Sequence, residues 1–170
     1  MVGHFATQNV DANGKWLPLA EIKNSSSGIA PTAGQMPRAL GLAFASKIFR
    51  SSAILQEHFP QLSNKGNEIC FCTIGDAATS EGHFWETINA SGVMQVPLAV
   101  FVWDDGYGIS VPTKYQTTKG SVSAALKGFQ KKEDTNGIDI YRVNGWDYAG
   151  MCEVFEQGLL KVRETHTPAV

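Results

Sequence analysis

ICFCTIGDAATSEG (residues 69–82) and LAVFVWDDGYGISVP (residues 98–112) are the two segments that decide the fold. Each begins with a short apolar run rich in β-branched and aromatic residues, as buried strands do, and then reaches aspartate and glycine. The residues between the two runs are enough for one crossover connection, which predicts parallel strands with their carboxyl ends at one edge. Asp76 and Asp105 are therefore expected at the edge where open α/β sheets bind ligands.

The residue types at this edge favour a metal-bound diphosphate. Asp76 and Asp105 offer carboxylate oxygens, which Mg²⁺ prefers, and Mg²⁺ usually shares its shell with phosphate oxygens and water. We expect Thr79 or Ser80 to cap a helix that runs from about Glu81 to Met94. The free N–H groups at the start of such a helix would face an anion. The small residues around Asp76 also let the backbone approach a ligand closely.

The rest of the chain alternates between helical and extended patterns. Helical spacing covers residues 35–50, with a continuation over 51–59, and Asp147 is expected to cap a helix that reaches about Arg163. The alternating segment 138–143 predicts a third strand, and residues 168–170 look like the start of a fourth. This order predicts an α/β fold, a three-layer parallel sheet with helices on both faces.

Length and composition predict one globular domain over residues 1–170, with an irregular N-terminal part over residues 1–24. We expect this domain to be a segment of a longer chain, because the sequence stops where a strand starts. The net charge is −2 and no basic run is present, which argues against nucleic acid or an anionic membrane as the main partner. The longest apolar run is too short to cross a bilayer.

Cys70 and Cys72 read as small core residues, and the three cysteines together predict neither a metal site nor a disulfide framework. Cys70 and Cys72 are two residues apart on a predicted strand, so they share one face, and Cys152 lies far from both in sequence. No zinc-ligand spacing is present. This cysteine usage favours a reducing compartment, the cytoplasm in a bacterium or the mitochondrial matrix in a eukaryote.

Three blocks of the sequence, in order, resemble one family. Residues 75–82, GDAATSEG, and 105–112, DGYGISVP, resemble the thiamine diphosphate motif in the α part of the E1 component of 2-oxoacid dehydrogenase complexes. Residues 25–41, SSSGIAPTAGQMPRALG, resemble an upstream segment of the same family. The resemblance covers most of the chain, from about residue 25 to residue 170.

The resemblance implies a set of metal ligands. Asp76 and Asp105 fall on the two metal-ligating side chains, and Tyr107 falls on the position whose backbone carbonyl completes the shell of Mg²⁺. The family usually has asparagine where this chain has Asp105, so one more negative charge stands beside the diphosphate.

The resemblance also implies the contacts of thiamine diphosphate. The N–H groups of Ala77 and Ala78 would reach the diphosphate, provided that Ala77 keeps a negative φ. Ala30 and Thr32 align with backbone positions that hold the aminopyrimidine ring. Gly75 and Ile109 complete the expected cofactor contacts, although the side chain of Ile109 is most simply a core residue.

The function that the resemblance implies is oxidative decarboxylation of a 2-oxoacid with transfer of the acyl group to the lipoyl arm of E2. A branched-chain acid is slightly favoured over pyruvate. The catalytic glutamate of this family comes from the β part, so this chain would hold only the metal–diphosphate half of a site shared within a homo- or hetero-oligomer. That β part is either a separate subunit or fused to this chain, and we expect no turnover from this segment alone.

Two alternatives belong to other classes. One is a catalytically inactive E1-like chain that acts as an assembly partner. The other is a receiver-like signalling module that binds Mg²⁺, although the order of its acidic residues would be reversed here.

Overall fold

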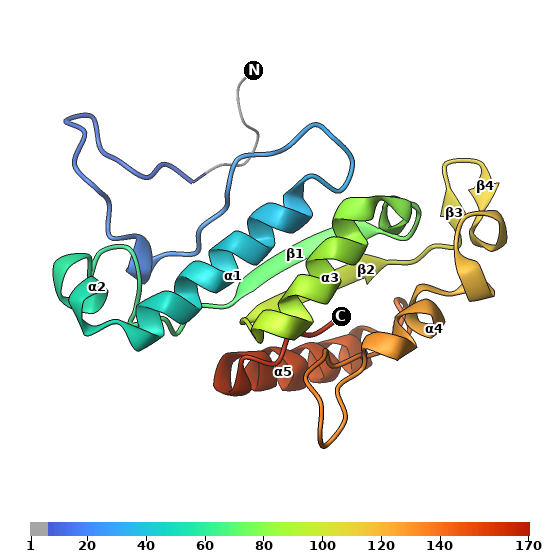
Figure 1. Ribbon diagram of the computed structural model, residues 1–170. Coiled ribbons are helices and arrows are strands. Elements are labelled where there is room, and N and C mark those ends of the chain that lie inside the picture. Colours follow the sequence, from blue (N-terminus) through green and yellow to red (C-terminus); the bar gives the residue numbers. More distant parts are fainter. Residues whose placement is uncertain (1–6) are drawn as a thin grey trace.

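The two predicted strands form the centre of the structure. The computed structural model describes residues 7–170. Strands β1 (Cys70–Gly75) and β2 (Leu98–Trp103) pair in parallel, with Gly75 opposite Trp103 at their carboxyl ends (Figure 1). The predicted parallel pair is therefore confirmed, and the loops that carry Asp76 and Asp105 leave the sheet at the same edge.

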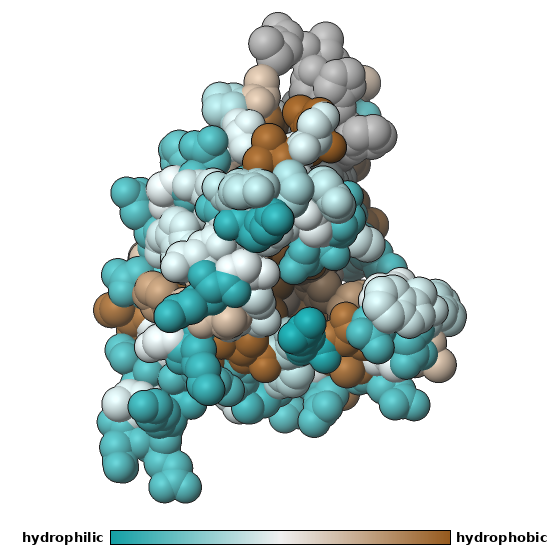
Figure 2. Space-filling model, turned by 90° about the vertical axis from the view of Figure 1, so that its right-hand side faces the viewer, coloured by the Kyte–Doolittle hydropathy of each residue, from teal (hydrophilic) through white to brown (hydrophobic). Residues whose placement is uncertain are grey.

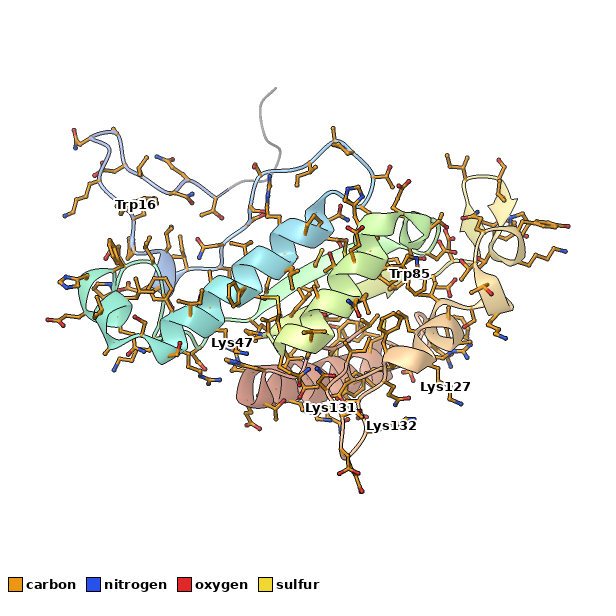
Figure 3. The ribbon with its side chains drawn as sticks, in the orientation of Figure 1. Trp16, Lys47, Trp85, Lys127, Lys131 and Lys132 are labelled. Carbon is orange, nitrogen blue, oxygen red and sulfur yellow. The ribbon has the colours of Figure 1, made fainter. Side chains whose placement is uncertain are left out.

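One face of this pair packs on two helices that lie side by side in Figure 1, α1 (Gln35–Ser51) and α3 (Gly82–Met94). The Sγ atom of Cys72 lies 3.7 Å from the Sδ atom of Met36 on α1. Lys47 reaches from α1 to the end of α3, where its Nζ donates to the carbonyl of Met94 at 2.6 Å (Figure 3). This face holds the core, which includes the fully buried side chains of Met36, Phe84, Ile88, Leu98, Leu126 and Ile138.

The opposite face of the sheet is only partly covered. Phe101 on β2 packs edge-on against Phe155 of α5 (Tyr148–Thr165), with 4.6 Å between ring centroids. Phe71 on β1 meets Phe101 in the same manner but stays 60% exposed. Helices therefore contact both faces, which confirms the α/β class, whereas a complete three-layer arrangement stays a prediction.

The predicted third and fourth strands are present only as isolated bridges. Ala169 bridges Ala99 of β2 on one side and Asp139 on the other, both in parallel. The segment 167–170 therefore lies between β2 and the segment 138–141, and the prediction of a regular strand over residues 138–143 is wrong. The alternating side chains are compatible with pairing, but the described residues form too few consecutive bridges for a regular strand.

The remaining elements are short. The helical continuation after α1 is a separate helix, because the backbone of Ser52 is extended and its hydroxyl caps the next helix by accepting from the N–H of Leu55. The predicted irregular N-terminal part contains one 3-10 turn and a single bridge between Val10 and Trp16, and residues 1–6 of it lie outside the described residues. The other elements are α2 (Ala53–His58), α4 (Val122–Leu126), the 3-10 turns η1 (Leu19–Glu21), η2 (Ala77–Ser80), η3 (Thr113–Tyr115), η4 (Thr118–Gly120) and η5 (Lys127–Phe129), and two two-residue strands that line the site.

The N-terminal caps predicted for α3 and α5 differ: the cap of α5 is present and the cap of α3 is not. Asp147 accepts from the N–H of Gly150 at 3.0 Å, so the predicted cap of α5 is confirmed. Neither Thr79 nor Ser80 caps α3, because both belong to η2 and Glu81 is the N-terminal residue that precedes the helix. Thr79 instead donates its hydroxyl to the carbonyl of Asp76 and tightens the turn after β1. In the described part of the chain, no helix combines the length and the apolar character needed to cross a membrane.

The two strand cysteines are expected to resist alkylation in the folded protein. Burial, reinforced by the neighbouring Cys72, raises the pKa of Cys70 to about 12, and burial raises the pKa of Cys72 to about 11. The thiolate is the reactive form, so a rise of two units in pKa lowers its fraction at pH 8 about a hundredfold. Cys152 is exposed, and we expect mass spectrometry to find iodoacetamide on Cys152 alone in the native protein and on all three thiols after denaturation.

Candidate functional site

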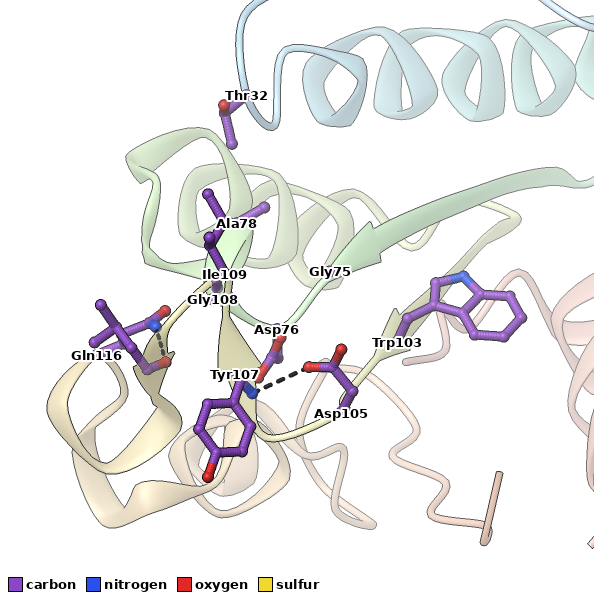
Figure 4. Close-up of a pocket in the computed structure, with 12 residues that line it drawn as sticks. Thr32, Gly75, Asp76, Ala78, Trp103, Asp105, Tyr107, Gly108, Ile109 and Gln116 are labelled. Carbon is purple, nitrogen blue, oxygen red and sulfur yellow. Dashed lines mark hydrogen bonds between the residues drawn. The ribbon is translucent and has the colours of Figure 1, made fainter. Parts of the chain in front are cut away.

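A pocket of about 610 Å³ lies at the carboxyl edge of β1 and β2 (Figure 4). It collects residues from the loop before α1, the ends of both strands and the segment after β2. Figure 2 views this side of the molecule, and hydrophobic surface shows in a hollow between more hydrophilic parts. The pocket is lined by Thr32, Gly75, Asp76, Ala77, Ala78, Trp103, Asp105, Tyr107, Gly108, Ile109, Val111 and Gln116. Every residue expected to contact the cofactor or metal, except Ala30, is in this lining.

Asp76 is the most buried acid of the pocket, with 3% of its surface exposed. Its backbone N–H donates to the carbonyl of Trp103 at 3.0 Å, which ties the end of β1 to the end of β2. Its Oδ2 atom accepts a hydrogen bond from the hydroxyl of Thr113 at 2.8 Å. A buried carboxylate needs such partners, because burial without them is costly.

Asp105 lies on a turn fixed by its own carboxylate. Its Oδ1 atom accepts from the N–H of Tyr107 at 3.0 Å, and Asp104 accepts from the N–H of Gly106 at 3.2 Å. These are the local side-chain-to-backbone bonds by which aspartate stabilises turns, and Gly106 has the positive φ of 83° that the turn requires. In Figure 4 the carboxylates of Asp76 and Asp105 face the same space.

A small hairpin forms the outer wall of the pocket. Strands β3 (Tyr107–Gly108) and β4 (Val111–Pro112) pair antiparallel, with Ile109 in the connecting turn. Ile109 has a positive φ of 58° and is fully exposed, at 103%. The interpretation of Ile109 as a core residue is therefore wrong, because the turn directs its side chain away from the protein. The ring of Tyr107 is also exposed rather than part of the core.

The hairpin lies directly against η2. A Cβ atom added to Gly108 would stand 2.6 Å from the Cβ of Ala77 and 2.5 Å from the side-chain amide of Gln116. Gln116 is itself held by a 2.6 Å bond from its Nε2 to the carbonyl of Val111. Ala77 is not among the described residues with a positive φ, so the backbone condition placed on it is met.

The two residues from the upstream loop differ in position. Thr32 lines the pocket, whereas Ala30 is exposed outside its lining. Sequence analysis did not predict four residues that line the pocket, Trp103, Gly108, Val111 and Gln116. It also missed Thr113, which holds Asp76. A glycine in a two-residue strand and a threonine in a polar loop carry little signal, although glycines on either side of Tyr107 are typical of a tight turn.

The donor set of the pocket fits a hard cation that is also held by a ligand. Among residues 7–170, no group of three or more His, Cys, Asp and Glu residues could hold a metal ion. One or two carboxylates are nevertheless the usual protein share of a Mg²⁺ shell, because phosphate oxygens and water supply the rest. Asp76 and Asp105 meet that requirement in chemical type.

The comparison with known families identifies the class of this protein. Residues 9–170 match the family described as "Dehydrogenase E1 component", so the chain belongs to that family. The resemblance to the α part of 2-oxoacid dehydrogenase E1 is thereby confirmed.

Named relatives fall into two groups. The chain is 26% identical over 166 residues to pyruvate dehydrogenase E1 component subunit alpha of Rickettsia bellii. The aligned region covers 97% of this chain and 44% of that protein. It is 31% identical over 118 residues to mitochondrial 2-oxoisovalerate dehydrogenase subunit alpha of Mus musculus, or 69% of this chain and 22% of that protein. The human form of the latter is 30% identical over the same share. The chain therefore spans less than half the length of these relatives.

Proposed function

We propose that this chain forms the metal–diphosphate half of the thiamine diphosphate site in a 2-oxoacid dehydrogenase E1. One observation carries the proposal: the loops after two adjacent parallel strands deliver Asp76 and Asp105 to a single pocket. The complete protein would decarboxylate a 2-oxoacid oxidatively and transfer the acyl group to the lipoyl arm of E2. Family membership supports this activity class.

Each group of pocket residues has a role in this proposal. Asp76, Asp105 and the carbonyl of Tyr107 would hold Mg²⁺, and the N–H groups of Ala77 and Ala78 would face the diphosphate. Thiamine diphosphate supplies the electron sink for the loss of carbon dioxide from the 2-oxoacid.

The remaining predicted contacts would bind the rest of the cofactor. Gly75 would let the backbone come close to the cofactor. The backbone groups of Ala30 and Thr32 and the exposed side chain of Ile109 would help to orient the rest of it. Mg²⁺ is needed at this edge because Asp76 and Asp105 would otherwise repel the diphosphate.

The substrate we favour remains a branched-chain 2-oxoacid, although relatives named for pyruvate and for 2-oxoisovalerate both match this chain. The proposal includes a β part, separate or fused, that completes the site, and a lipoyl-bearing E2 as the acceptor. Family membership gives the receiver-like alternative no support, whereas an inactive assembly partner would belong to the same family.

Calorimetry separates an active E1 from an inactive assembly partner. The chain is joined to its β part, freed of metal, and titrated with thiamine diphosphate with and without Mg²⁺. We expect saturable binding that requires Mg²⁺, because the carboxylates repel the diphosphate when no cation neutralises them. Absence of binding in both titrations would contradict the proposal and favour the assembly role.

A methyl group on Gly108 is expected to weaken cofactor binding. In a Gly108→Ala variant the flexible side chain of Gln116 can move away, but the contact with Ala77 requires η2 to shift. Overpacking of this kind costs about 1–3 kcal/mol of stability, and a cost of the same size to cofactor binding would lower the affinity about fivefold at its lower end. The control is Gly128→Ala, because a Cβ there meets nothing within 4 Å. Equal affinities of the two variants for thiamine diphosphate would show that η2 does not contact the cofactor.

A further inference from the structure

Thr113 connects the two halves of the pocket through different atoms. It follows β4 as the first residue of η3, and its surface is only 8% exposed. Its hydroxyl donates to Oδ2 of Asp76 at 2.8 Å, and its backbone N–H donates to the carbonyl of Gly106 at 2.9 Å. One residue thus contacts both the acid after β1 and the turn after β2.

The hydroxyl restricts the carboxylate that it contacts. A carboxylate has two oxygens with about four lone-pair sites, and a hydroxyl has one proton to donate. The bond from Thr113 engages Oδ2 of Asp76 and thereby sets the rotation of the whole carboxyl group. The remaining acceptor sites keep a fixed direction, and the capacity to ligate a cation is retained.

The backbone bond restricts the other acid. Gly106 belongs to both local turns, because its own N–H donates to Asp104 and it is the middle residue of the turn in which Asp105 accepts from the N–H of Tyr107. Because the N–H of Thr113 holds the carbonyl of Gly106, the turn that carries Asp105 cannot move independently of the residue that fixes Asp76.

We propose that Thr113 is a positioning residue, which holds the Asp76 carboxylate and the Asp105 turn in a single arrangement for one shared divalent cation. This inference rests on the proposed function, because it assumes that the two acids bind one ion. Thr113 itself does not contact the ion; it acts through Asp76, as hydrogen-bond partners of metal-ligating carboxylates commonly do.

The test measures divalent-cation affinity in the complete protein with its β part and thiamine diphosphate. Mn²⁺ is the probe, and the loss of its free electron paramagnetic resonance signal reports binding. Thr113→Val removes the hydroxyl and keeps the shape, and we expect its Mn²⁺ dissociation constant to rise about 10–100-fold. Thr113→Ser keeps the hydroxyl and is expected to bind Mn²⁺ nearly as the parent does. Turnover of Thr113→Val at saturating Mn²⁺ should approach that of the parent, since both ligands are still present.

Thr117→Val is the matched control. Thr117 lies in the same segment, is also 8% exposed, and its backbone N–H donates to the carbonyl of Thr113 at 2.8 Å. It therefore reports the cost of removing a buried hydroxyl nearby. If Thr113→Val does not fold, Thr113→Ala serves as the second variant without a hydroxyl.

The outcomes separate this inference from the function on which it rests. If the parent binds Mn²⁺ and the hydroxyl-free variants bind it as tightly as Thr117→Val does, the role of Thr113 is overturned and the proposed function stands. If Thr113→Ser, which keeps the hydroxyl, loses as much affinity as Thr113→Val, the hydroxyl is not what sets the affinity and the role is again overturned. If the parent itself binds no Mn²⁺ with thiamine diphosphate present, the proposed function fails and this inference fails with it.

Discussion

Replacing Asp76 with alanine in the complete protein is expected to lower the affinity for Mg²⁺ and thiamine diphosphate by more than about a hundredfold. Loss of an outer hydrogen-bond partner of a metal ligand typically costs 10–100-fold, and Asp76 is proposed to be a ligand itself. The variant also removes the acceptor of the Thr113 hydroxyl, which leaves that buried group unpaired. Calorimetry in the presence of the β part measures the affinities, and turnover at limiting Mg²⁺ should fall in parallel.

Asp76→Asn provides the control for shape. Asparagine keeps the size of the side chain and can still accept from Thr113, but it lacks the negative charge. We expect its affinity for Mg²⁺ to lie between those of the parent and Asp76→Ala. Circular dichroism of each variant checks that the fold is retained. A folded Asp76→Ala protein that binds Mg²⁺ and thiamine diphosphate as the parent does would exclude Asp76 as a ligand.

Asp105→Ala is expected to have the second largest effect. The change removes an oxygen ligand and also the bond to the N–H of Tyr107, whose carbonyl is the third proposed ligand. Both losses act on the same ion, so we expect the Mg²⁺ affinity to fall about a hundredfold, at the upper end of the range for ligand-supporting groups. The midpoint of activation by Mg²⁺ measures this change.

Asp105→Asn and Asp104→Ala make the result specific. Asparagine retains an oxygen ligand and can accept from Tyr107, so we expect this variant to stay active and to bind the diphosphate at least as well, because one negative charge is removed. Asp104 is adjacent and equally charged but is not part of the pocket lining. A loss in Asp104→Ala as large as that in Asp105→Ala would point to general disturbance of the turn and not to metal ligation.

Helices and strands could be predicted from the sequence wherever a local pattern was strong. The two apolar runs predicted β1 and β2, and the polar–apolar spacing predicted α1, α3 and α5. The cap at Asp147 was predictable because it needs only its own neighbours in sequence. The segment 138–141 was less predictable, because its pairing depends on residues 168–170, which are close in space and distant in sequence.

The proposed metal ligands could be predicted from the sequence, but the residues that hold those ligands in place could not. Asp76 and Asp105 stood out because each follows an apolar run and precedes a glycine or other small residue. Ile109 was misjudged because hydrophobicity favours burial, whereas its left-handed backbone in a two-residue turn forces exposure. Thr113 carried no signal, since its hydroxyl meets an acid 37 residues earlier in the chain.

The position of the segment 167–170 between β2 and residues 138–141 has a consequence for synthesis on the ribosome. The stretch 138–141 emerges first but cannot settle beside its final neighbour, because that neighbour has not yet been translated. During this interval the free edge of β2 has unpaired backbone groups, and it can accept the wrong segment or another nascent chain. Pairings between residues that are distant in sequence form slowly, so this edge is where assistance from a chaperone would matter most.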